Sequence, residues 1–130
     1  HEPYRRQRQM CIETAHIPND VSREVHACMC YIHNHINVPI SLDDVAASIG
    51  RSVSYTGNLF KKETGKTLGT YIAECRLDEA RSLLHHTEMT LAEISSYLCF
   101  SSQSYFQNVF KKEYGVTPMQ YRRQHHSKSR

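Results

Sequence analysis

The chain has 130 residues, of which 39% are apolar and none is tryptophan, so it can bury only one or two modest cores. Its net charge is +3, but residues 1–100 hold ten Lys and Arg against twelve acids, whereas residues 101–130 hold six against one. No stretch is long and apolar enough to span a membrane, and no secretory signal is visible, which argues against a membrane protein and predicts a soluble, cytoplasmic one.

The first helix is predicted after an irregular start. Because the chain begins at His1 rather than methionine, we expect residues 1–20 to be a linker or the end of a missing amino-terminal region. Residues 21–36 carry apolar side chains at helical spacing, which predicts an amphipathic helix capped by Asn19 or Asp20.

A capping pattern marks the next helix. Ser41 and Asp44 have the spacing of a capping box, with Asp in place of the usual Glu, and the helix should end at Gly50. Its predicted buried stripe is formed by Leu42, Val45, Ala46 and Ile49.

A third helix follows after a tight turn. Ser52 is its predicted cap, Leu59 and Phe60 should face inward, and Gly65 should end it. Two short helices joined by a turn are the layout of a helix-turn-helix, so residues 21–67 are predicted as a first subdomain.

The longest central apolar pattern runs from about Leu68 to His85 and predicts a helix that connects two parts of the chain, assigned to residues 68–86. Its apolar positions are Tyr71, Ile72, Leu77, Ala80, Leu83 and Leu84. At roughly 1.5 Å per residue this helix would span about 27 Å, similar to the roughly 34 Å between successive major grooves on one face of DNA.

The remainder repeats the first unit about fifty residues later, ending in the same Phe-Lys-Lys-Glu tetrad. Thr90 is predicted to cap one helix, and Ser101 or Ser102 the next, which should end at Gly115. A final short helix starts at Thr117–Pro118. Residues 87–124 are therefore predicted as a second helix-turn-helix subdomain, followed by a basic tail, residues 125–130.

Helix geometry predicts which side chains could reach DNA. If Leu59 and Phe60 face the core, the opposite face of that helix presents polar side chains, and so does the equivalent face of its repeat in the second unit. The start of this second recognition helix should also lie near the DNA groove. Asn and Gln can pair with adenine and Ser can donate or accept, whereas Lys and helix amino termini suit phosphate. The alternative is a merely solvated face. The predicted base contacts are Ser54, Gly57, Asn58, Ser102, Gln103, Ser104, Gln107 and Asn108, and the phosphate contacts are Ser52, Lys61, Thr90, Lys111 and Arg76.

Other chemistries lack a pattern. The five cysteines and nine histidines show no metal-ligand spacing, and no nucleophile elbow or phosphate loop is visible, so no cofactor, metal or catalytic residue is predicted and the chain is expected not to be an enzyme. The cysteines are expected to be reduced and structural. A helical protein–protein interaction adaptor is the alternative to a DNA-binding domain.

A long ordered signature is carried by the second half of the chain. It reads Ile72-x-x-x-Arg76-Leu77-x-x-Ala80-x-x-Leu83-Leu84 and then Thr90-Leu-x-x-Ile94-x-x-x-Leu98-x-Phe100-x-Ser102-Gln-Ser-Tyr105-Phe106-x-x-x-Phe110-Lys-Lys-Glu-Tyr-Gly115-Val-Thr-Pro118-x-x-Tyr121-Arg122. Over roughly residues 21–123 the chain resembles the DNA-binding domain of AraC/XylS-type transcription regulators. The resemblance implies an all-α fold of two helix-turn-helix subdomains joined by a long connecting helix, bound to double-stranded promoter DNA.

Further partners follow from the same resemblance. A full-length protein would carry a sensor or receiver domain ahead of this one, able to mediate dimerisation, and RNA polymerase is an expected partner. Arg76 occupies a position that matches the family, where a salt bridge to Asp78, Glu79 or another neighbour competes with a role in DNA contact.

Several residues depart from the family pattern. Cys99 stands at a turn where glycine is usual, which predicts strain if its φ is positive. Thr56 replaces an apolar side chain, and Gly57 lies inside a recognition helix at a cost of roughly 1 kcal/mol against alanine. Apart from these departures, Arg122 and Arg123, with the His-Ser-Lys-Ser-Arg tail, are expected to add nonspecific charge or to be disordered.

Overall fold

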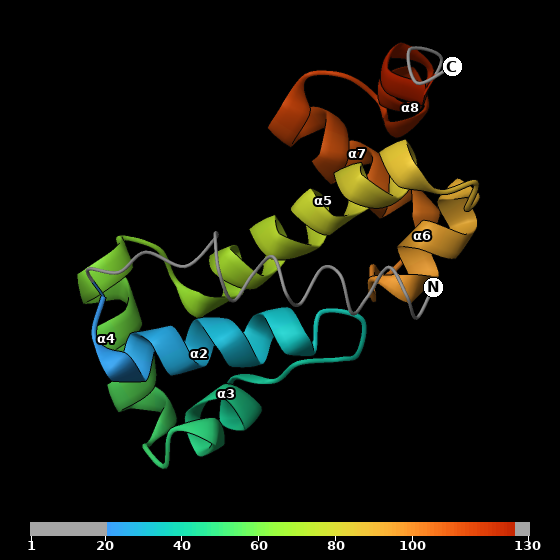
Figure 1. Ribbon diagram of the computed structural model, residues 1–130. Coiled ribbons are helices and arrows are strands. Elements are labelled where there is room, and N and C mark those ends of the chain that lie inside the picture. The colour runs from blue at the N-terminus through green and yellow to red at the C-terminus, as the bar shows by residue number, and fades with distance from the viewer. Residues whose placement is uncertain (1–20, 127–130) are drawn as a thin grey trace. The chain divides into compact units, whose positions relative to one another are not determined.

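The computed structural model describes residues 21–126, and every regular element in that range is an α-helix (Figure 1). The helices are α2 (Arg23–Asn34), α3 (Leu42–Ser48), α4 (Val53–Thr64), α5 (Leu68–His86), α6 (Leu91–Tyr97), α7 (Gln103–Tyr114) and α8 (Pro118–His126). The prediction of an all-α chain with one long central helix is confirmed. Within residues 21–126, no helix has the length and apolar character that crossing a membrane requires.

The chain divides within α5 into two compact units, one ending at Ala73 and the other beginning at Glu74. The predicted linker, residues 1–20, lies outside the described residues, as does most of the predicted basic tail.

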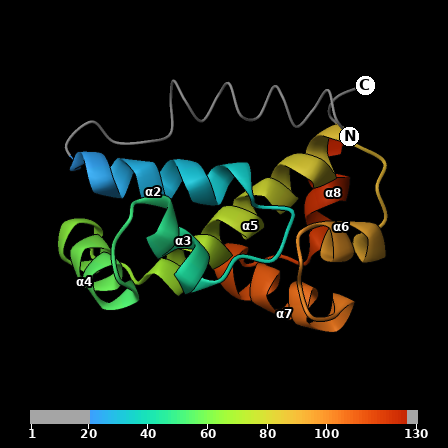
Figure 2. The ribbon, with the colours of Figure 1, turned by 90° about the horizontal axis from the view of Figure 1, so that it is seen from below.

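The first unit packs α2 against both helices of a helix-turn-helix, α3 and α4 (Figures 1 and 2). The apolar face predicted for α2 is buried, and its buried members are Val25, Cys28, Met29 and Ile32. The predicted caps Asn19 and Asp20 lie outside the described residues. The structure has Ser22 as the cap instead, because its hydroxyl accepts a hydrogen bond from the Val25 amide at 3.3 Å.

Local signals fix the ends of α3 and α4 as predicted. The capping box is complete, with Ser41 and Asp44 each accepting from the other's backbone amide. Gly50 follows α3 with a φ of 68°, a left-handed conformation that glycine adopts without a Cβ penalty. Ser52 caps α4, and Gly65 ends it.

One prediction for α3 is wrong. Leu42 was expected in the buried stripe, but 44% of it is exposed, whereas Val45 and Ala46 are buried. The physical reason is position: Leu42 is the first residue of the helix and borders an open groove beside α4 rather than the core.

The start of α5 closes the core of the first unit. The Tyr71 ring lies edge-on to Phe60, with centroids 5.2 Å apart, and its hydroxyl is 2.8 Å from His33 Nε2. Tyr71 therefore links α5, α4 and α2.

The second unit repeats these devices with different residues. Thr90 and Glu93 form a complete capping box on α6, and Ser102 rather than Ser101 caps α7. Cys99 takes the left-handed conformation of Gly50, with a φ of 64°. The condition set for strain at this cysteine, a positive φ, is therefore met.

Arg122 corrects another expectation. It is half-buried and ordered, and its guanidinium donates to the carbonyl oxygens of Leu84 at 3.1 Å, Met89 at 2.5 Å and Thr87 at 3.1 Å, with a longer contact to Leu83 at 3.5 Å. These oxygens lie at the end of α5 and just after it, where helix carbonyls lack partners within the helix. Arg122 thus ties α8 to the end of α5, which a reading of the tail as excess charge missed.

Candidate nucleic-acid interface

The two sides of α4 differ sharply in burial. Phe60 is fully buried and Thr56 is 1% exposed, while Ser54, Asn58 and Lys61 are exposed. The hydroxyl of Thr56 donates to the Ser52 carbonyl at 2.7 Å, so this polar residue occupies an apolar position without an unpaired group. The helix therefore presents a polar face opposite its core contacts.

The same division holds on α7. Phe106 and Phe110 are fully buried, and their rings meet edge to face with centroids 5.9 Å apart. Of the predicted base contacts, Gln103, Ser104 and Asn108 are exposed and Gln107 is half-buried. Lys111 is exposed in the last turn, where its charge also favours the carboxyl end of the helix dipole.

Three hydroxyls predicted to contact DNA serve as helix caps. Ser52 and Ser102 accept from the amides of Tyr55 and Tyr105 at 3.1 and 3.0 Å, and Thr90 accepts from Glu93 at 3.1 Å. A capping hydroxyl uses a lone pair and keeps its own hydrogen to donate. Each can therefore cap its helix and donate to an anion such as phosphate.

An ion-pair cluster that the sequence interpretation missed holds the start of α4. Glu24, on α2, accepts from Arg51 Nε at 2.8 Å and from the Tyr55 hydroxyl at 2.8 Å. The hydrogen bonds from Arg51 and then Tyr55 keep the pKa of Glu24 below its ordinary value. The guanidinium of Arg51 also lies 4.8 Å from the centre of the Tyr55 ring. The cluster connects α2 with the turn before the recognition helix; no sequence spacing indicates a pairing across 27 or 31 residues.

The structure brings together only part of each predicted set. Gly57, Asn58 and Lys61 line one open groove in the first unit, and a Cβ on Gly57 would meet nothing within 4 Å. The remaining predicted base contacts, from Ser102 to Asn108, lie in the second unit. Arg76 is half-buried on α5, and its role in DNA contact stays a prediction.

Metal and thiol chemistry find little support in the described range. Residues 21–126 contain no group of three or more His, Cys, Asp or Glu placed to hold a metal ion. Among the described residues, Cys28, Cys30, Cys75 and Cys99 form no disulfide, and Cys11 lies outside the described residues. Burial raises the pKa of Cys28 to about 11, which keeps it protonated and unreactive.

The geometry defines a class: an all-helical domain with two helix-turn-helix units, each presenting a polar recognition face. A family model described as a helix-turn-helix domain matches residues 45–124. The chain is 42% identical over 94 residues to the xylose operon regulatory protein of Escherichia coli K12, covering 72% of this chain and 24% of that protein. It is 35% identical over 112 residues to the regulatory protein PocR of Salmonella typhimurium, covering 86% and 37%.

The fold agrees with these matches. A crystal structure of an AraC-type transcriptional regulator from Chromobacterium violaceum superposes with a TM-score of 0.75 and 29% identity, covering 78% of this chain and 91% of that one. The chain belongs to the AraC-type helix-turn-helix family of DNA-binding transcription regulators. This membership favours DNA binding over the adaptor alternative. The chain spans between a quarter and two fifths of the two curated relatives.

Proposed function

We propose that the chain reads a bipartite, non-palindromic site on promoter DNA, with α4 and α7 as recognition helices in adjacent major grooves. The observation that carries this proposal is the paired geometry of the two helices. Each buries a phenylalanine, Phe60 or Phe110, and exposes an asparagine and a lysine at equivalent positions. Since the two units follow in direct order and are not identical, the site should lack two-fold symmetry.

Base reading is assigned to the polar side of each helix. Asn58 and Asn108 can each pair with adenine N6 and N7, and Gln103 and Gln107 add two further amides in the second unit only. The remaining predicted contacts are Ser54, Gly57, Ser102 and Ser104, which offer a hydroxyl or close backbone approach. The second unit should therefore supply most of the discrimination.

Phosphate contacts set position rather than sequence preference. Lys61 and Lys111 are assigned this role, with the hydroxyls of Ser52 and Thr90. Arg76 stays a proposed phosphate contact. The predicted boundaries, residues 21–67, 68–86 and 87–124, are kept as the proposed division into first subdomain, connecting helix and second subdomain.

The wider setting is proposed from the family. We infer a cytoplasmic regulator that acts by binding rather than turnover, needs no cofactor, and works with RNA polymerase. The relatives' greater length supports a sensor or receiver domain elsewhere in a full-length protein. That domain would mediate dimerisation.

Selection of bound duplexes from a random pool, followed by footprinting, tests this function. We expect one motif with two conserved segments about one helical turn apart, each containing A·T pairs, and protection of both by a monomer. Protection of one short segment only would contradict simultaneous reading. Binding that showed no salt dependence or no sequence preference would favour the adaptor alternative.

A further inference from the structure

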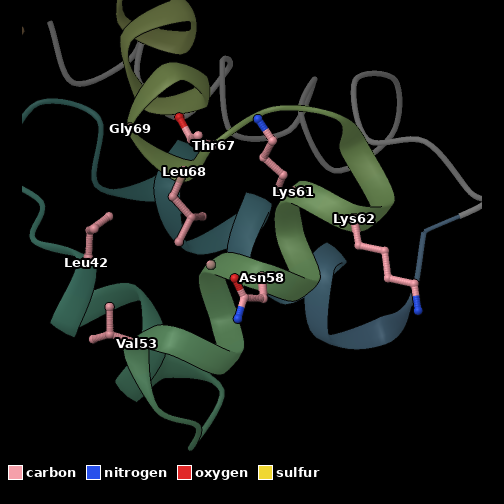
Figure 3. Close-up of a pocket in the computed structure, with 9 residues that line it drawn as sticks. Leu42, Val53, Asn58, Lys61, Lys62, Thr67, Leu68 and Gly69 are labelled. Carbon is pink, nitrogen blue, oxygen red and sulfur yellow. The ribbon is translucent and has the colours of Figure 1, made fainter.

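An open, largely apolar groove lies beside the recognition helix of the first unit. It is formed by the start of α3, the length of α4 and the start of α5, and has a volume of about 640 Å³ (Figure 3). Leu42 and Val53 lie together on one side, and Leu68 points into the space between α5 and α4. The groove is far larger than the roughly 30 Å³ that one water takes in the liquid.

Two kinds of residue produce the groove. Gly57 and Gly69 line it without a side chain, and Leu42 leaves apolar surface exposed at its mouth. In the second unit the positions equivalent to Val53 and Gly57 are Gln103 and Gln107. The first recognition helix therefore presents carbon where the second presents amides.

The groove shares its edge with the proposed DNA-reading face. Asn58 and Lys61 both line it, and both are exposed on the side of α4 opposite Phe60. Lys61 and Lys62, which also line the groove, bring positive charge to this side of α4, which suits a polyanion and disfavours a basic partner. Apolar surface at the edge of a base-reading helix matches one feature of the major groove, the 5-methyl group of thymine.

We propose that the first unit recognises a thymine methyl in this groove, with Val53 as the residue that contacts it and Leu42 as the neighbouring wall. The inference rests on the proposed function, because it requires α4 to lie in the major groove. The methyl belongs to a thymine within one base-pair step of the adenine that Asn58 reads. Asn58 recognises the polar edge of an A·T pair, and Val53 the carbon that only thymine among the four DNA bases carries.

Base analogues test the proposal on the selected duplex. Each thymine of the first half-site is replaced in turn by deoxyuridine, which lacks only the methyl group. We expect one position where this change weakens binding about three- to five-fold, the size of one lost methyl contact. At the same position, a 5-methylcytosine·guanine pair should bind more tightly than a cytosine·guanine pair by a similar factor.

Two variants assign the effect to the protein side. In Val53→Ala the penalty for deoxyuridine should fall to less than about 1.5-fold, because the contacting methyl groups are gone. Val53→Thr keeps the branched shape and should reduce the penalty partly. Helix content by circular dichroism checks that both variants fold. Gln103→Ala, the equivalent change in the second unit, is the matched control: it should weaken binding to the thymine and deoxyuridine duplexes alike, and so leave the ratio between them intact.

The outcomes separate this inference from the proposed function. If the protein binds a bipartite site but no thymine of the first half-site responds to deoxyuridine, the inference is wrong and the function stands. A deoxyuridine penalty that persists undiminished in Val53→Ala also overturns the inference. If the groove binds a protein partner instead of DNA, DNA affinity should be unchanged in both Val53 variants, and this result too would overturn it. If no duplex is selected at all, both fail.

Discussion

The first unit places Gly50 at its left-handed turn and follows it with the Glu24–Arg51–Tyr55 cluster, whereas the second places Cys99 at the same turn and follows it with the uncharged Phe100 and Ser101. The second unit instead has Arg122 at the position of the buried Ile72. The helix-turn-helix plan is thus kept by repeated caps and buried phenylalanines. The additional contacts that stabilise each unit differ: the Glu24–Arg51–Tyr55 cluster in the first unit, and Arg122 in the second.

The largest effect should come from Arg122, which distinguishes the units most. In Arg122→Ala the carbonyls at the end of α5 lose a charged donor, so the free energy of unfolding of the second unit should fall by about 2–4 kcal/mol. Urea unfolding and amide hydrogen exchange in α6 measure this. Arg123→Ala, at the exposed neighbouring residue, is the control and should change stability by less than about 0.5 kcal/mol. Equal losses of stability in Arg122→Ala and Arg123→Ala would mean that positive charge in α8, and not the hydrogen bonds to the carbonyls of α5, stabilises the second unit.

The next effect concerns unequal base reading. Gln107→Ala or Asn108→Ala should each cost about 1–3 kcal/mol of binding free energy on the selected site, because each amide can make a paired contact with a base. Asn58→Ala should cost less, since the first unit has fewer long polar side chains. Titration of labelled duplex measures all three. A larger loss at Asn58 would reverse the ranking of the two units.

The turn residues should produce opposite changes of about 1 kcal/mol. Cys99→Gly removes the Cβ from a left-handed residue and should stabilise the second unit, while Gly50→Ala should destabilise the first by a similar amount. A Cβ at Gly50 meets nothing within 4 Å, so its penalty is conformational rather than steric. Thermal unfolding measures both changes.

Gly57→Ala is the matched control for these turns. Gly57 lies within helix α4 and also has open space around it, so this change should stabilise by up to about 1 kcal/mol. If Gly50→Ala were equally stabilising, backbone strain at the turns would be ruled out.

The smallest effect should be shared equally by the two units. Lys61→Ala and Lys111→Ala should each weaken all DNA sequences alike and reduce the slope of log K against log salt by about one unit. Binding measured across a salt series, on selected and scrambled duplexes, provides the test. A change of the preferred motif in Lys111→Ala would show that this lysine reads bases.

Local signals made most of the fold predictable. Ser41, Thr90 and Gly65 act within a few residues of themselves, so the capping box at Ser41, the cap at Thr90 and the end of α4 at Gly65 were correct. The duplicated Phe-Lys-Lys-Glu tetrad aligned the two units. The polar faces of α4 and α7 followed from helix periodicity.

Contacts between distant residues were not predictable in the same way. Arg122 and the carbonyl of Leu84 are 38 residues apart, and only the packing of α8 brings them together. Leu42 has an apolar side chain at helical spacing, yet it is 44% exposed, because it is the first residue of α3 and borders an open groove rather than the core. A sequence pattern predicts which face of a helix is apolar, but it does not predict the shape of the neighbouring elements that this face meets.

The reach of Arg122 also bears on the order of events during synthesis. Every residue of the first unit has been translated by Ala73, whereas Arg122, whose guanidinium closes the end of α5, is translated 49 residues later. At roughly 5–20 residues per second, that interval lasts several seconds. A nascent chain can therefore hold a finished first unit while the second still lacks its closing contact, which makes the newly made second unit the part exposed to chaperones and proteases.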